Sequence, residues 1–187
     1  MARYRPWGVH REIERPYTRF SYSKKLNFIP GAPESKVRIF VYGVKQKNPK
    51  DWKYVGHLIA LENIQISDSS IEAVRINLNK YLEKEIRDFL FVIKGYPHHV
   101  VREHAIAYGA GADRISQGMR LSFGKPVRRA MQLYPGKIVL SIYFDNPNFV
   151  ENIKKYLRIA KCKLSGNYFI YVGENIDEKE LIKKLGI

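Results

Sequence analysis

The chain has 187 residues, 45% of them hydrophobic, and 33 Lys and Arg against 18 Asp and Glu, which gives a formal net charge of +15. These values predict one folded domain with a packed core and a polyanionic partner. No apolar run approaches the ~20 residues of a membrane span, no long helix is expected to be basic on one side and apolar on the other, and a single cysteine excludes an intramolecular disulfide. We therefore expect a cytosolic protein without a membrane partner.

The first 33 residues form a basic and aromatic segment in which no hydrophobic period lasts. Residues 1–50 hold 12 Lys and Arg against 3 acids. Such a segment cannot bury enough apolar surface to fold alone, but it can follow phosphates while its rings stack on bases or on the domain. We interpret residues 1–33 as an RNA-binding arm rather than a solvated tail. Its candidate RNA-binding cations are Arg3, Arg5, Arg11, Arg15, Arg19, Lys24 and Lys25.

Residues 34–187 have the hydrophobic patterns of a single α+β domain. The predicted strands are residues 36–42, 54–66 as one or two strands with a bulge or bend at Gly56, 89–93, 127–133, 137–144 and 167–172. A Pro-Gly turn joins the strands 127–133 and 137–144. The predicted helices are residues 67–87, with Ser69 and Glu72 at capping-box spacing, the stripe 150–160 with Asn148 as its cap, and 177–185. This order favours an α+β fold in which two main helices pack on a largely antiparallel sheet with hairpin-type strands, with a basic N-terminal arm and a long glycine-rich loop.

The glycine-rich loop lies within residues 95–126, which we expect to be extended or loop structure. Residues 94–129 hold 7 Lys and Arg against 2 acids, whereas residues 51–93 hold 5 against 7. Glycines let the backbone approach a ligand closely, so we favour a functional loop at 104–126 over a mobile surface loop. The Gly-Ala-Gly-Ala run at 109–112 lacks the order of a phosphate-binding loop. The candidate RNA-binding residues here are His98, His99, Arg102, Arg120, Lys125, Arg128 and Arg129.

Catalytic and metal-binding alternatives have less support. Adjacent His98 and His99 point to opposite faces of an extended segment, and no Cys, Asp or Glu stands at ligand spacing from them or from His104. Asp113 in a basic cleft would suit an RNA-modifying enzyme, but no second acid, Ser–His pair or cofactor loop accompanies it. Cys162 lacks a positioned His and is expected to be structural. We expect no enzyme, metal or cofactor, and keep open an RNA-modifying enzyme using Asp113 or a free-standing RNA-binding module.

Six segments of the chain follow one another in an order and spacing known from one family. They are RPYTR (15–19), IPGAPESKVRIFVYG (29–43), EAVRINLNKYL (72–82), GYPHHVVRE (95–103), GADRISQGMRLSFGKP (111–126) and PGKIVLSI (135–142). Together they resemble the universal large-subunit ribosomal protein sixteen family, in its archaeal and eukaryotic ten-e branch, over nearly the whole chain. The chain departs from that family at Arg128 and Arg129, where small residues are usual. It ends at Ile187 without the long extension of eukaryotic members, which indicates an archaeal-type protein.

The resemblance implies an α+β body packed among the ribosomal RNA (rRNA) helices of the large ribosomal subunit. It implies a structural protein that binds rRNA, helps position transfer RNA near the peptidyl transferase centre during translation, and acts in the cytoplasmic ribosome. The implied partners are rRNA, transfer RNA and neighbouring ribosomal proteins, without a homo-oligomer. The family's loop toward transfer RNA corresponds to residues 107–117 here. Its transfer-RNA-proximal residues are Gly109, Gly111, Ala112, Asp113, Arg114 and Gln117.

Overall fold

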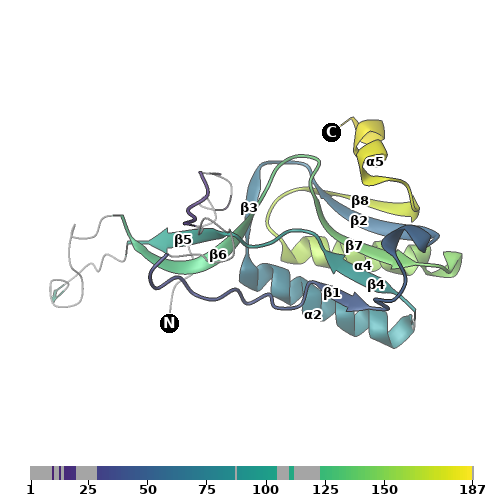
Figure 1. The fold of residues 1–187 in the computed structure, drawn as a ribbon, viewed down its shortest axis with the longest axis horizontal. Helices are drawn as coiled ribbons and strands as arrows, with labels where there is room; N and C mark the ends of the chain where they lie inside the picture. The colour runs from purple at the N-terminus through teal and green to yellow at the C-terminus, as the bar shows by residue number, and fades with distance from the viewer. Residues whose placement is uncertain are drawn as a thin grey trace.

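The computed structural model describes residues 10, 13, 15–19, 29–86, 88–104, 110–111 and 123–186, and these form two antiparallel sheets and three α-helices (Figure 1). The larger sheet has the strand order β1-β4-β7-β2-β8, and the smaller has the order β3-β6-β5. The strands are β1 (Val41–Gly43), β2 (Tyr54–Ala60), β3 (Ile64–Ser67), β4 (Leu90–Ile93), β5 (His99–Glu103), β6 (Lys125–Leu133), β7 (Ile138–Phe144) and β8 (Tyr168–Glu174). The helices are α2 (Asp68–Glu85), α4 (Val150–Lys163) and α5 (Glu178–Leu185), with short 3-10 helices η1 (Pro49–Asp51) and η2 (Pro147–Phe149). The predicted α+β class is confirmed.

The five-stranded sheet lies between two helical layers, with α2 and α4 on one face and α5 on the other (Figure 1). Successive side chains of a strand point to opposite faces of the sheet, so β2 contributes to both layers. Leu58 joins the core under α2 and α4, whereas Ile59 packs with Leu181 of α5. Leu78 of α2 and Leu157 of α4 are almost fully buried in the same core. Burying a side chain of this size stabilises the fold by roughly 1.5–3 kcal/mol. None of the helices in the described ranges is long and apolar enough to span a membrane.

Gly56 lets helix α4 lie close against strand β2. A Cβ atom at this position would stand 2.9 Å from Cγ2 of Ile153 and 3.1 Å from Cδ1 of Leu157. The bulge predicted at this glycine is wrong, because the β2–β7 register runs regularly through Gly56 and shifts between Leu58 and Ile59. The glycine therefore serves the packing of α4 on β2.

The Pro-Gly turn is confirmed, but the strands on either side of it do not pair with one another. Gly136 has a φ of 82°, and the Lys137 N–H donates to the Tyr134 carbonyl at 3.1 Å, as a type II turn requires. Strand β6 pairs with β3 and β5, whereas β7 pairs with β2 and β4. The hairpin expected here is wrong, and the turn connects the two sheets. It is fixed to β2, since the Gly136 N–H donates to the Ala60 carbonyl at 2.9 Å.

Several helix caps and strand boundaries in the structure differ from those predicted from the sequence. The N-cap of α2 is Ser67, whose Oγ accepts a hydrogen bond from the Ser70 N–H, and Glu72 pairs with Arg75 instead of capping. Asn148 lies in η2 and caps no helix with its side chain. The strand predicted at 36–42 is reduced to β1, because the Lys36 N–H donates to the Asp68 carboxylate rather than to a strand. The described parts of the segment 95–126, predicted as extended or loop structure, contain β5 and the start of β6.

Candidate nucleic-acid interface

Strands β5 and β6 form a two-stranded ribbon that projects from one end of the body, at the left of Figure 1. They pair antiparallel from His99 opposite Ala130 to Glu103 opposite Lys125. Gly124 allows the two backbones to meet at the tip, because its φ is 86° and a Cβ there would stand 3.0 Å from the carbonyl carbon of Glu103. Four of the predicted RNA-binding cations lie on this ribbon, namely Arg102, Lys125, Arg128 and Arg129.

The guanidinium group of Arg102 contacts two aromatic rings from distant parts of the sequence. Its central carbon is 3.9 Å from the ring centroid of Phe123 and 4.6 Å from that of Tyr17. The two rings meet edge-on with their centroids 5.5 Å apart. Each cation–π contact contributes roughly 0.5–1 kcal/mol at an exposed site and about 2 when desolvated. We call these three residues the Arg102 cluster.

The backbone of Tyr17 is held beside β5 by two hydrogen bonds. The Tyr17 N–H donates to Nδ1 of His99 at 2.9 Å, and the Tyr17 carbonyl accepts from the Val100 N–H at 3.3 Å. His99 is only 5% exposed, so its ring holds the arm to the sheet. The predicted contact of His99 with RNA stays a prediction. His98 is half-buried and its Nδ1 bonds the Tyr96 carbonyl at 3.0 Å.

Arg128 and Arg129 make contacts within the protein. Arg129 donates from Nε to the Pro33 carbonyl at 2.7 Å, and Arg128 donates from Nη1 to the Ser69 hydroxyl at 3.3 Å. Both side chains are half-buried. They join the ribbon to the end of the arm and to the start of α2, which gives a structural reason for arginine at these two positions. Their predicted contact with RNA stays a prediction.

The remaining predicted site residues divide into exposed positions and positions outside the described residues. Arg15, Arg19, Gly111 and Lys125 are exposed. The others lie outside the described part of the chain and stay predictions: Arg3, Arg5, Arg11, Lys24, Lys25, Gly109, Ala112, Asp113, Arg114, Gln117 and Arg120. Within the described part, no group of three or more His, Cys, Asp and Glu side chains is placed to hold a metal ion.

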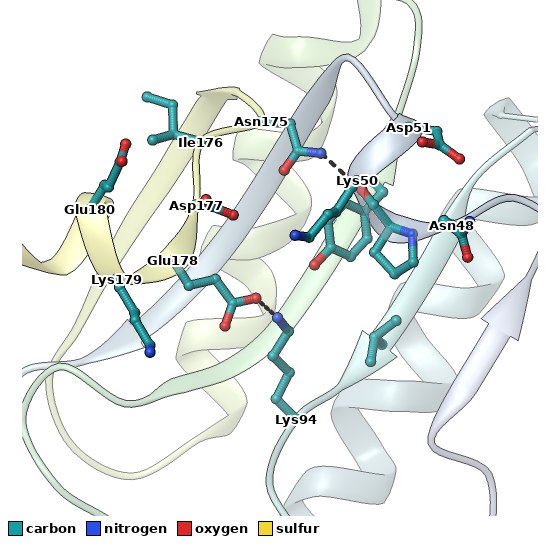
Figure 2. A pocket seen from close by; sticks show the side chains of 13 residues that line it. Asn48, Lys50, Asp51, Lys94, Asn175, Ile176, Asp177, Glu178, Lys179 and Glu180 are labelled. Atoms are coloured by element: carbon teal, nitrogen blue, oxygen red, sulfur yellow. Dashed lines mark hydrogen bonds and ion pairs between the residues drawn. The ribbon is translucent and has the colours of Figure 1, made fainter.

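An open pocket of about 1000 Å³ lies between η1, strands β4 and β7, and the start of α5 (Figure 2). Two of its polar side chains make contacts that join the segments around it: Lys94 forms an ion pair with Glu178, and the Asn175 amide donates to the carbonyls of Pro49 and Trp52, both at 2.9 Å. These contacts fix the segment before α5 and the start of that helix to the sheet. We therefore interpret the pocket as a structural junction between the sheet and α5 rather than as a reaction site.

His57 lies in the sheet beside Tyr143, which lines the pocket. It is fully buried, and its Nδ1 shares a 2.8 Å hydrogen bond with the Ser141 hydroxyl. Burial first, and the nearby charge of Lys94 second, lower the pKa of His57 from 6.5 to about 4. The ring is therefore neutral near pH 7 and acts as a packed element of the sheet, stacked on Tyr171.

Helix α4 carries cations that we did not select from the sequence. Its buried residues are Ile153, Tyr156, Leu157 and Ala160. Its other side holds Lys154, Lys155, Arg158, Lys161 and Lys163. The expectation that no long helix is apolar on one side and basic on the other is thus wrong. The sequence signal for this basic side is the three- and four-residue spacing of the cations along the predicted helix.

A basic α+β domain whose cations gather on a projecting ribbon, with an arm anchored beside it, belongs to the class of nucleic-acid-binding proteins. A family model described as "Ribosomal protein L16p/L10e" matches residues 17–171. The large ribosomal subunit protein uL16 of Nanoarchaeum equitans is 50% identical over 171 residues, which cover 90% of this chain and 92% of that relative. Its counterpart in Archaeoglobus fulgidus is 42% identical over 88% of this chain and 89% of its own, and that of Haloarcula marismortui is 36% identical over 86% and 89%. The chain belongs to the ribosomal protein L16p/L10e family, and the predicted family is confirmed.

Proposed function

We propose that the protein is a structural constituent of the large ribosomal subunit whose arm, residues 1–33, binds rRNA together with the tip of the β5–β6 ribbon. The loop at 104–126, carried by a single domain at 34–187, then lies where it helps position transfer RNA near the peptidyl transferase centre. Family membership supports the ribosomal role, and the names of the relatives place those proteins in the large subunit.

The observation that carries this proposal is the Arg102 cluster. Tyr17 belongs to the arm, Arg102 lies near the end of β5 before the loop, and Phe123 follows the loop directly. The cluster therefore brings the arm and both ends of the loop to one place at the ribbon tip. Segments that are separate in the sequence would meet RNA as one surface.

The charges at this tip suit a phosphate backbone. Lys125 is exposed two residues after Phe123, and Arg15 and Arg19 are exposed two residues before and after Tyr17. Phe123 contacts Arg102 and Tyr17 and is still 63% exposed. A cationic surface with an accessible ring fits unpaired nucleotides, whose bases stack on aromatic side chains. In this proposal the chemistry around the loop belongs to RNA, and no side chain acts as acid, base or nucleophile.

The salt dependence of RNA binding tests the arm. The slope of log K against log salt changes by about 0.7–0.9 for each phosphate contact removed. Replacing Arg11, Arg15 and Arg19 by Ala should therefore flatten the slope by about two units in binding to large-subunit rRNA. An unchanged slope would exclude the arm as an RNA contact.

Deletion of residues 108–115 tests the loop. Subunits that have fully incorporated the shortened protein should translate slowly and bind transfer RNA weakly, because the segment assigned to transfer RNA is missing. Normal translation and normal transfer RNA binding by such subunits would refute the role of the loop. Turnover of isolated RNA by the wild-type protein, lost in Asp113→Ala, would instead favour the alternative of an RNA-modifying enzyme.

A further inference from the structure

The outer side of α4 is rich in cations. Lys154, Lys155 and Arg158 lie on it, Lys161 and Lys163 lie at its edges, and we call these five residues the α4 basic face. Glu151, the only acid of this helix, lies on the same side, one turn before Lys154 and Lys155. At a rise of 1.5 Å per residue, the five cations span about 13 Å of helix. The ion pairs of the described residues involve none of them, whereas Lys47, Arg75 and Lys94 each have an acidic partner.

The buried side of α4 fixes which side of the helix faces outward. Ile153 and Leu157 are fully buried, and they are the side chains that crowd Gly56 of the sheet. Tyr156 stacks on Tyr81 of α2 with their centroids 5.2 Å apart. The apolar side of α4 is thus buried in the core. This excludes a membrane-binding role for the helix, because an amphipathic helix binds a membrane by inserting its apolar side into the lipid.

The α4 basic face differs from the ribbon tip in having no aromatic group. The large hydrophobic side chains exposed in the described residues include Phe123 near the ribbon tip, but none of them lies in α4. Single-stranded nucleic acid is held by cations together with stacking rings, whereas an RNA duplex keeps its bases stacked inside and offers phosphates and 2′-hydroxyl groups. A mainly cationic surface without aromatic rings therefore matches the backbone of a duplex.

We propose that the α4 basic face binds the phosphate backbone of an RNA duplex, as a second RNA surface separate from the arm and the ribbon tip. In Figure 1, α4 lies beneath the five-stranded sheet, while β5 and β6 project from the far left end of the body. Two surfaces so placed join two RNA segments through one rigid domain. The inference deepens the proposed ribosomal function by naming a second contact, and the binding of a duplex to the free protein tests it independently.

A charge-matched pair of variants tests this surface. The first is Lys154→Ala, Lys155→Ala and Arg158→Ala combined, and the control is Lys179→Ala, Lys183→Ala and Lys184→Ala combined in α5, where the three lysines are also exposed. Both lose three charges, and Ala preserves the helix. Equal melting temperatures and circular dichroism spectra establish that both variants fold.

Binding is measured with a short blunt-ended RNA duplex and with a single-stranded oligouridine of the same length, between about 50 and 200 mM salt. Losing three phosphate contacts should weaken duplex binding by roughly 100-fold at about 0.15 M salt and reduce the salt slope by 2–3 units. Oligouridine binding should stay at the level of the α5 control. If duplex affinity falls no further in the α4 variant than in the control, the inference is wrong, and an acidic protein partner becomes the explanation of this face.

Cys162 provides a reporter that needs no substitution. It is the only cysteine of the chain, it is exposed, and it lies between Lys161 and Lys163. The duplex should slow its alkylation by N-ethylmaleimide at least fivefold, whereas oligouridine bound at the arm should not. Equal alkylation rates with and without saturating duplex would overturn the inference.

A ternary complex tests the joining of two RNA segments. Wild-type protein held on immobilised oligouridine should retain labelled duplex, and the α4 variant should bind the oligouridine but not the duplex. Loss of oligouridine binding alone, after replacement of Arg11, Arg15 and Arg19, reports on the proposed arm and leaves the α4 result intact. Mutually exclusive binding of the two RNAs to wild-type protein would refute two separate surfaces.

Discussion

Removal of the Arg102 guanidinium tests how the arm is held on the ribbon. In Arg102→Ala the cation–π contacts to Tyr17 and Phe123, at 4.6 and 3.9 Å, are both lost. Only the Tyr17 contact joins Arg102 to the arm, so at roughly 0.5–1 kcal/mol for a contact of a half-buried cation the arm loses about 0.5–1 kcal/mol of docking free energy. Because about 1.4 kcal/mol corresponds to a factor of ten, local opening of the arm should become about 2- to 5-fold more frequent.

Amide hydrogen exchange of Tyr17 and Val100 measures this opening. The Tyr17 N–H is bonded to His99, and the Val100 N–H is bonded to the Tyr17 carbonyl, so both amides exchange when the arm lifts from β5. We expect both to exchange about 2- to 5-fold faster in Arg102→Ala, while the core amide of Leu140 is unchanged. Unchanged exchange at Tyr17 would show that the cluster does not hold the arm, and equal acceleration at Leu140 would show a global rather than a local effect.

Three further predictions concern the body. Leu78→Ala should lower the free energy of unfolding by about 2–5 kcal/mol in urea titrations, because Leu78 is 1% exposed. Ile76→Ala on the same helix should cost at most ~0.5 kcal/mol, because Ile76 is 53% exposed. Equal losses in the two variants would mean that the buried face of the helix is misassigned. Gly56→Ala should destabilise the protein by about 1–3 kcal/mol, since its Cβ has no room under α4, and an unchanged melting temperature would contradict that packing. His57 is buried in its neutral form with its pKa lowered to about 4, so its contribution to the free energy of unfolding is complete above pH 6.5 and falls by at most ~3 kcal/mol as the pH is lowered toward 4. A His57→Gln variant should lack this part of the pH dependence of stability. The same pH profile of stability in the variant and in wild type would refute the assignment.

The helices and the core were accessible from the sequence because their signals are local. The apolar positions of α2 at Ile71, Val74, Leu78 and Leu82 all lie in the core, as their spacing predicts. The turn at Gly136 was also predictable, since its geometry depends on adjacent residues. Caps were less accessible, because several Ser and Asp side chains at 67–70 compete for the same role.

Strand pairing was not accessible, because it depends on partners far apart in the chain. Nothing adjacent to the Pro-Gly turn indicates that β6 and β7 enter different sheets. The same limit applies to the cations. Arg129 bonds a carbonyl 96 residues away and Arg128 a hydroxyl 59 residues away, so their basic character indicated RNA while their positions serve the fold. The Arg102 cluster needed the fold as well, since its rings are more than 100 residues apart in the sequence.

Retention on intact large ribosomal subunits during a high-salt wash tests the central claim most directly. The wild-type protein should sediment with the subunits, as a structural constituent with many phosphate contacts does. The variant with Arg11, Arg15 and Arg19 replaced by Ala should be released at lower salt, while the α5 control, with Lys179, Lys183 and Lys184 replaced, should be retained like wild type. Release of wild-type protein at low salt, as for a free-standing RNA-binding module, or identical release of all three proteins, would contradict the account.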